Sequence, residues 1–113
     1  MHELSLVESA IHIIEDAARA QQFKRVRVVW LEVGRLASVE PDALRFCFDA
    51  VAEGTVAQNA RLEIVDVPGS GACADCGSVH SVSNFIDACP ACGAYAVRVT
   101  GGTGMRVKEL DVV

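Results

Sequence analysis

The sequence predicts an α+β fold, a small mixed sheet of about three strands with two helices, into which a zinc-ribbon module is inserted. Three observations predict it. Two segments with helical spacing alternate with segments of strand-like alternation. Two Cys-x-x-Cys-Gly pairs stand close together after the second strand-like segment. A further alternating segment follows the cysteines, so the ribbon interrupts the sheet domain before its last strand.

The first expected elements are a helix from 4 to 21 and a strand from 25 to 33. In the helix, apolar residues recur at intervals of three and four: Leu4, Val7, Ile11, Ile14 and Ala18, widened by Leu6, Ala10, Ile13 and Ala17. Polar residues such as Glu8, His12, Glu15 and Asp16 fall on the opposite side. The strand is rich in valine, and its run from Val28 to Leu31 indicates that both faces are partly covered.

A turn from 34 to 38 leads into the second expected helix. Ser38 or Glu40 caps this helix, and Pro41 lies in its first turn, where a missing N–H does no harm. Gly54 ends it. Its buried stripe is expected to contain Leu44, Cys47, Phe48 and Val51, so that Cys47 is an inert buried thiol.

The remaining chain is expected to form a strand from 60 to 67, a short linker from 68 to 71, the cysteine ribbon and a last strand from 105 to 113. The last strand should return to the sheet. Residues 1–69 and 104–113 are therefore predicted to form an α/β domain, and residues 72–100 a four-cysteine ribbon domain.

Composition fits a globular protein outside the membrane. Apolar residues make up 51% of the 113 residues, and no apolar run approaches the ~20 residues of a membrane helix. The formal charge of −5 repels phosphate backbones, so neither nucleic acid nor a membrane is an expected partner. The Met1-His2-Glu3 start lacks the basic region of a signal peptide, so a cytoplasmic location is expected.

The four cysteines in pairs predict one structural zinc ion per chain. Cys73 and Cys76 form one knuckle, Cys89 and Cys92 the other, with twelve residues between them. Each Cys-x-x-Cys turn points two sulfurs at one ion, and the glycine that follows accepts a positive φ. Four thiolates close the coordination shell, which suits Zn²⁺ and leaves no open position for a substrate.

Several alternatives stay open for this ribbon. A redox disulfide needs only one such pair, and a rubredoxin-like iron site has a longer interval and a more aromatic shell than the single Phe85 found here. Nucleic-acid binding is disfavoured by the charge. His80 is expected in an exposed ribbon loop, with ligand exchange at the metal as the alternative.

The amino-terminal residues offer a second metal site of different chemistry. The Met1 amine, the His2 amide nitrogen and the His2 imidazole lie within one short stretch of backbone, and Glu3 is near enough to add a donor. Nitrogen donors in a plane suit Ni²⁺ or Cu²⁺ better than Zn²⁺. Glu40 could lend a carboxylate if the amino terminus folds over it, although an acid that favours the helix start is the simpler role.

The whole chain resembles the HypA/HybF family of hydrogenase nickel-incorporation proteins. The resemblance runs through Met1-His2-Glu3-Leu4-Ser5-Leu6, Val29-Trp30-Leu31-Glu32-Val33-Gly34, Glu40-Pro41-Asp42-Ala43-Leu44-Arg45-Phe46-Cys47-Phe48-Asp49, Gly54-Thr55-Val56-Ala57 and both knuckles. It implies nickel ligands at Met1, His2 and Glu3 and zinc ligands at Cys73, Cys76, Cys89 and Cys92.

The resemblance also implies a nickel metallochaperone that carries Ni²⁺ as transient cargo in [NiFe]-hydrogenase maturation. The implied partners are a HypB-type GTPase and the hydrogenase large subunit, and a homodimer stays open. No enzyme is expected, because the sequence holds no nucleophile beside a base, no phosphate-binding loop and no open zinc position. The competing interpretation is a zinc-ribbon adaptor in which His2 is incidental.

Overall fold

Two helices and two small sheets make up the described part of the chain, residues 2–113 of the computed structural model. Met1 lies outside the described residues, and of His2 only its place in a helix is described. The elements are α1 (His2–Gln21), β1 (Val26–Gly34), a 3₁₀ turn (Arg35–Ala37), α2 (Pro41–Ala52), β2 (Arg61–Val67), β3 (Gly69–Cys73), β4 (Val79–Val82), β5 (Val97–Gly101) and β6 (Met105–Val112). The strand orders are β2-β1-β6 and β4-β3-β5. The predicted α+β class is confirmed.

The chain divides into two compact units. The first unit comprises Met1–Glu32, Val39–Val65 and Met105–Val113, and the second comprises Val33–Ser38 and Asp66–Gly104. The first unit contains both helices, and the second contains all four paired cysteines. The last strand β6 pairs with β1, as expected for a chain that returns to its first sheet after the ribbon.

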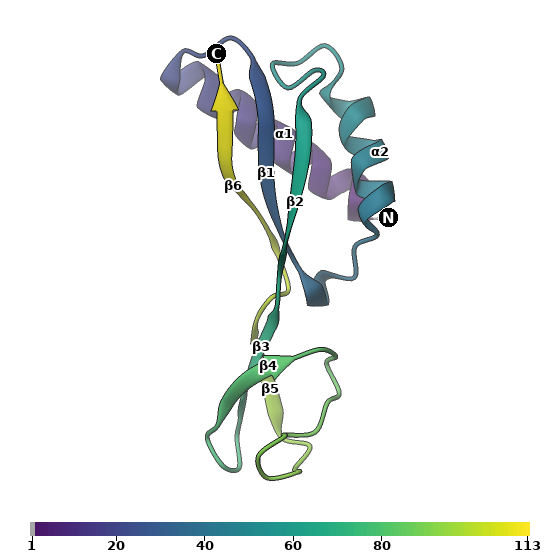
Figure 1. The fold of residues 1–113 in the computed structure, drawn as a ribbon, viewed down its shortest axis with the longest axis vertical. Coiled ribbons are helices and arrows are strands. Elements are labelled where there is room, and N and C mark those ends of the chain that lie inside the picture. The colour runs from purple at the N-terminus through teal and green to yellow at the C-terminus, as the bar shows by residue number, and fades with distance from the viewer. Residues whose placement is uncertain (1) are drawn as a thin grey trace. The chain divides into compact units, whose positions relative to one another are not determined.

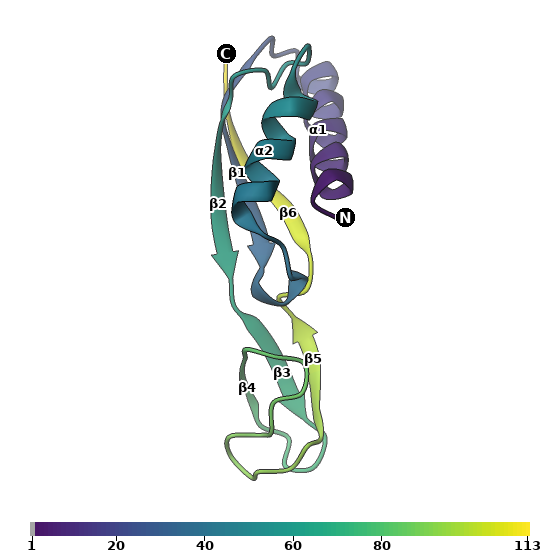
Figure 2. The same cartoon turned by 90° about the vertical axis from the view of Figure 1, so that its right-hand side faces the viewer.

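The sheet β2-β1-β6 is mixed and carries both helices on one face. Figure 1 and Figure 2 show β1 and β2 running in the same direction, with β6 opposed to them and α1 and α2 on the same side of the sheet. Parallel neighbours need a crossover connection, and α2 supplies it between β1 and β2. Ion pairs join β1 to β6 at Arg27–Asp111 and Glu32–Arg106, each at 2.8 Å.

Helix α1 buries a narrower stripe than its sequence predicts. Val7, Ala10, Ile11, Ile14 and Ala18 are buried. Leu4 and Ile13, in contrast, are 48% and 50% exposed, so their expected burial is wrong. Ile13 borders a hollow of about 290 Å³ that Phe23 and Leu110 also line. Neither described helix is long and apolar enough to cross a lipid bilayer.

The start of helix α2 is fixed by a side chain that caps its first turn. Of the two predicted caps, Glu40 is the one used: its Oε1 accepts a hydrogen bond from the Asp42 N–H at 2.9 Å. Leu44 and Phe48 are buried as predicted, whereas Cys47 is only half-buried. The expectation of a buried Cys47 is therefore wrong, because the buried face of α2 consists of Leu44, Phe48 and Ala52.

The second sheet corrects one prediction. Residues 68–71 were expected to form a linker, but Gly69–Cys73 is the central strand of this sheet, paired antiparallel with β4 and with β5. The neighbouring strands approach Gly69 and Gly71 so closely that a side chain at either position would not fit. A Cβ on Gly71 would lie 2.7 Å from Val82 Cγ2 and 2.8 Å from Val97 Cγ1, and one on Gly69 would overlap the Val82 carbonyl oxygen.

Candidate metal centre

Four thiols of the second unit converge on one point. The sulfurs of Cys73, Cys76, Cys89 and Cys92 all lie within 4.8 Å of one another. The Cys73–Cys92 and Cys76–Cys89 sulfurs are each 3.7 Å apart. A disulfide would require about 2.05 Å. Four sulfurs at about 2.3 Å from one tetrahedral ion would be about 3.8 Å apart, so the spacing fits a four-thiolate metal site.

The two knuckles have the same backbone design. In each, the first cysteine donates its N–H to a carbonyl five residues later, Cys73 to Ser78 and Cys89 to Ala94, both at 2.9 Å. The glycine of each knuckle donates back to that cysteine's carbonyl, at 2.9 Å for Gly77 and 2.8 Å for Gly93. Both glycines have a positive φ, +77° and +79°, which a residue with a Cβ rarely adopts. The predicted role of these glycines is confirmed.

Burial alternates within each knuckle. Cys73 and Cys89 are buried, at 3% and 2% exposed, whereas Cys76 and Cys92 are exposed. The cage is therefore anchored from inside the unit by the first cysteine of each pair and closed at the surface by the second. All four side chains are supplied by residues of the two knuckle turns, so the backbone of these turns sets where the sulfurs lie.

Ser78 belongs to this site, although the cysteine spacing did not single it out. Its hydroxyl lies 3.2 Å from the Cys76 sulfur and 3.3 Å from the Cys89 sulfur, where it can donate to a thiolate. This hydroxyl, followed by the backbone N–H groups of Cys92 and Ala91, lowers the pKa of Cys89 to about 5. It also lowers the pKa of Cys76. The equivalent position of the second knuckle is Ala94, so a comparison of the two knuckles does not single out Ser78.

Cys92 differs from its neighbours. The backbone N–H of Ala94 lowers its pKa, but partial desolvation of the sulfur within the cluster and the surrounding cysteine sulfurs outweigh that bond and raise the pKa to about 12. Four close sulfurs resist full ionisation without a cation, because each new thiolate repels the others. A divalent ion at the centre would remove that repulsion.

His80 lies elsewhere than the sequence indicated. It was expected in an exposed loop, but it is a half-buried residue of β4, opposite Gly71 of β3. Both ring nitrogens are buried and have no hydrogen-bond partner within the described part of the chain. The pairing of β4 with β3 draws this segment into the sheet and accounts for the difference. His80 is not a member of the sulfur cluster.

Two of the three predicted nickel residues, His2 and Glu3, lie at the start of α1. Met1 is outside the described residues, and His2 is the first residue of the helix. The Glu3 carboxylate accepts a hydrogen bond from the backbone N–H of Glu40 at 3.1 Å, and this bond is the largest cause of its lowered pKa. The carboxylate of Glu40 caps α2, the simpler of the two roles considered for it.

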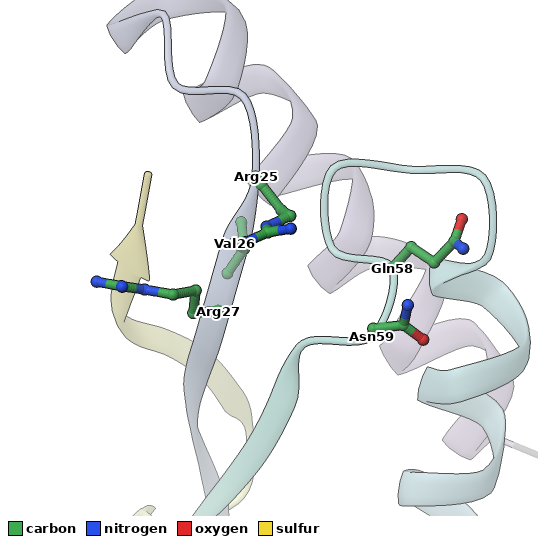
Figure 3. A pocket seen from close by; sticks show the side chains of 5 residues that line it. All are labelled: Arg25, Val26, Arg27, Gln58 and Asn59. Carbon is green, nitrogen blue, oxygen red and sulfur yellow. The ribbon is translucent and has the colours of Figure 1, made fainter.

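Another hollow of the first unit holds no predicted ligand. It has a volume of about 310 Å³ and is lined by Arg25, Val26, Arg27, Gln58 and Asn59. Figure 3 shows Arg25 directed towards Gln58 and Asn59, while Arg27 points away over β6, where it pairs with Asp111. These side chains include no nucleophile, carboxylate or thiol, so the hollow has no metal-binding chemistry.

Comparison with known proteins matches the chain over nearly its whole length. Residues 1–112 match the family described as hydrogenase/urease nickel incorporation, metallochaperone, hypA. The hydrogenase maturation factor HypA of Albidiferax ferrireducens is 53% identical, and that of Dechloromonas aromatica 50%, with 99% of each chain covered. The solution structure of the Ni metallochaperone HypA from Helicobacter pylori matches with a TM-score of 0.76 at 28% identity, covering 100% of this chain and 98% of that one. The chain therefore belongs to the HypA family of nickel-incorporation metallochaperones for hydrogenase maturation, a family of metal carriers and not of enzymes.

Proposed function

We propose that this chain binds Ni²⁺ through Met1, His2 and Glu3 and delivers it to the large subunit of a [NiFe]-hydrogenase. One zinc ion held by the four-cysteine cage stabilises the ribbon. In this account the α/β domain, residues 1–69 and 104–113, carries the cargo, and residues 72–100 form the zinc domain. Family membership supports the nickel role, and the convergence of four sulfurs supports the zinc role.

The chemistry of the cage supports zinc as its metal. The sulfur–sulfur distances of 3.7 Å match the edge of a ZnS₄ tetrahedron, and all four donors are soft thiolates. The second unit buries few large apolar side chains, so metal–sulfur bonds would supply stability that a small core lacks. Metal analysis of the purified protein distinguishes zinc from iron, because a four-thiolate iron site colours the protein red.

The position of His2 supports a nickel site. The first four N–H groups of an α-helix have no acceptor within the helix, so the helical hydrogen bonds of α1 do not engage the His2 amide. An amide nitrogen, an imidazole and an amine are donors that Ni²⁺ favours. The Glu3 carboxylate adds a negative charge beside them, and its bond to Glu40 fixes where that charge lies.

The helix start also makes this site suitable for a transient cargo. The amino-terminal end of a helix carries partial positive charge and disfavours a cation by about 0.3–1 kcal/mol. The donors come from three consecutive residues of the sequence, so a partner's ligands can replace them one at a time. The closed four-cysteine cage offers no comparable route of exchange.

The partners we propose are a HypB-type GTPase and the hydrogenase large subunit. The sequence has no phosphate-binding loop, so any step driven by nucleotide needs a second protein. We place this delivery in the cytoplasm, because reduced thiols are required for the zinc cage and a reducing compartment maintains them. A homodimer is compatible with the proposal but is not required by it.

Nickel titration of the untagged protein tests the proposal. We compare it with a variant extended by Gly-Ser before Met1, which moves the amine away from the imidazole. The proposal predicts weaker nickel binding by at least about tenfold in the extended protein, with unchanged zinc content. Equal affinity in both would contradict a site built on the Met1 amine and favour the zinc-ribbon adaptor.

A further inference from the structure

The ribbon exposes large apolar side chains on one segment. Phe85, Ile86 and Tyr95 are 58%, 83% and 85% exposed. Ile86 and Tyr95, together with Asp87 and Val97, line a hollow of about 180 Å³. We call these four residues, Ile86, Asp87, Tyr95 and Val97, the ribbon patch. Aromatic and aliphatic groups gathered around a hollow are typical of a protein-binding site, whereas single exposed apolar residues are ordinary.

The segment that carries this patch is held in a defined shape. The Asp87 carboxylate accepts hydrogen bonds from the backbone N–H groups of Ser83 and Asn84, both at 3.1 Å, and from the Asn84 side chain at 3.4 Å. On the other side of the hollow, the Ala74 N–H donates to the Ala96 carbonyl at 2.9 Å, next to Tyr95. Because the backbone that carries these apolar side chains is held by hydrogen bonds before a ligand arrives, less backbone conformational entropy is lost on binding.

Charge indicates which kind of ligand fits. The second unit contains three aspartates, Asp66, Asp75 and Asp87, against two arginines and no lysine. Arg35 is paired with Asp66 at 2.7 Å. The two other aspartates, Asp75 and Asp87, are then balanced in number by a single arginine, Arg98, and metal-bound thiolates would add further negative charge. The patch therefore suits a cationic ligand and repels phosphate groups of nucleic acid or of anionic lipid.

A second copy of this chain is a poor occupant. Two copies meeting at the patch would bring Asp87 of each into one interface, which like charges disfavour. The exposed parts of Ile86 and Tyr95, the two large apolar side chains of the patch, amount to about 340 Å² if each side chain offers about 200 Å². A stable dimer needs about 800 Å² from each partner. The area corresponds to a short segment instead.

We propose that the ribbon patch docks a short segment of a partner protein in which an aromatic or aliphatic side chain is flanked by lysine or arginine. The apolar side chain fills the hollow between Ile86 and Tyr95, and the cation meets the carboxylate of Asp87. This role goes beyond nickel carriage, because none of its residues is a proposed metal ligand. It assigns partner recognition to the ribbon whether or not His2 binds nickel.

Peptide titration of the ¹⁵N-labelled full-length protein tests this proposal. The two probes are Ac-Lys-Phe-Leu-Lys-NH₂ and its acidic counterpart Ac-Glu-Phe-Leu-Glu-NH₂. We expect saturable amide shifts confined to residues 83–97 with the basic peptide, and binding at least about tenfold weaker with the acidic one. Raising the salt from about 0.05 M to about 0.5 M should weaken the basic peptide further. Equal shifts with both peptides, or shifts spread over the first unit, would overturn the proposal.

Two variants complete the test. The double variant Ile86→Ser, Tyr95→Ser should bind the basic peptide at least about tenfold more weakly. The control is Val79→Ser, because Val79 is 75% exposed on β4 and does not line the hollow. It should bind as the parent does. Undiminished binding by the double variant, or self-association that this variant abolishes, would show that the segment we propose is not the occupant.

Discussion

The Glu3 carboxylate accepts a hydrogen bond from the backbone N–H of Glu40 at 3.1 Å, across 37 positions of the sequence. This bond joins the first turn of α1 to the cap of α2, which Glu40 forms with its own carboxylate. The start of α1 is therefore tied to a second helix. A carboxylate has about four acceptor positions, so one such bond fixes Glu3 without using up its capacity to bind a metal.

Substitution of Glu3 separates a ligand from a positioning residue. Glu3→Gln keeps an oxygen that can accept the Glu40 N–H but removes the negative charge. We expect it to weaken nickel binding about tenfold and to leave the melting temperature unchanged, because only the charge at the metal is lost. Glu3→Ala should weaken nickel binding similarly and also lower the melting temperature. Calorimetric titration and thermal unfolding measure both, and parental nickel affinity in Glu3→Gln would exclude a ligand role.

The cap of α2 should contribute measurably to stability. Glu40→Ala removes the oxygen that accepts the Asp42 N–H and should lower the free energy of unfolding by about 1 kcal/mol. Glu40→Asp keeps a capping carboxylate and should restore most of the loss. Glu53→Ala, at the exposed opposite end of the helix, is the control and should change stability by less than about 0.5 kcal/mol. Urea denaturation measures all three, and an equal loss in Glu40→Asp would argue against the cap.

The Ser78 hydroxyl should tune the sulfur cage. Ser78→Ala removes the group that lies within 3.3 Å of both Cys76 and Cys89, so we expect metal affinity to fall about tenfold or more. Ser81→Ala, an exposed serine on β4, is the matched control and should keep the parental affinity. Competition with a chromophoric chelator measures the difference. Equal affinity in the two variants would mean that the backbone N–H groups alone support the thiolates.

The close approach of strands at Gly69 predicts that alanine destabilises the protein at this position but not at Gly104. Gly69→Ala would drive a Cβ into the Val82 carbonyl oxygen and to within 2.7 Å of Leu36 Cδ1, and should destabilise the ribbon by about 1–3 kcal/mol. At Gly104 a Cβ would meet nothing within 4 Å. Gly104→Ala should therefore be close to neutral. Hydrogen exchange of the β3 amides reports on the ribbon directly, and protection that is unchanged in Gly69→Ala would refute the packing argument.

Sequence patterns predicted the elements well where the pattern is local. The helical spacing, the Pro41 start and the cysteine pairs each depend on a few neighbouring residues, and the corresponding elements are present. The prediction was wrong at the two glycines that were assigned to a linker, Gly69 and Gly71. Glycine is typical of a flexible linker, and it is also typical of a central strand whose neighbours approach too closely for a Cβ. Gly69 and Gly71 therefore do not distinguish a linker from a strand.

Contacts between distant segments could not be predicted in the same way. The exposure of Leu4 and Ile13 depends on where the sheet and α2 end against α1, which spacing along one helix does not contain. The Glu3–Glu40 bond and the place of Ser78 beside the thiols arise only once the chain has folded. The nickel ligands stay a prediction, since Met1 and the His2 side chain lie outside what the structure describes.

Delivery of nickel through the first residues is tested most directly by hydrogenase activity in cells whose own copy of this chain is replaced by a variant. We compare His2→Ala with His12→Ala, because His12 is an exposed histidine of the same helix that pairs with Asp16 at 3.5 Å. With limiting nickel, His12→Ala should support parental activity, whereas His2→Ala should lose most of it while keeping its fold and its zinc. Parental activity in His2→Ala would contradict nickel delivery from this site.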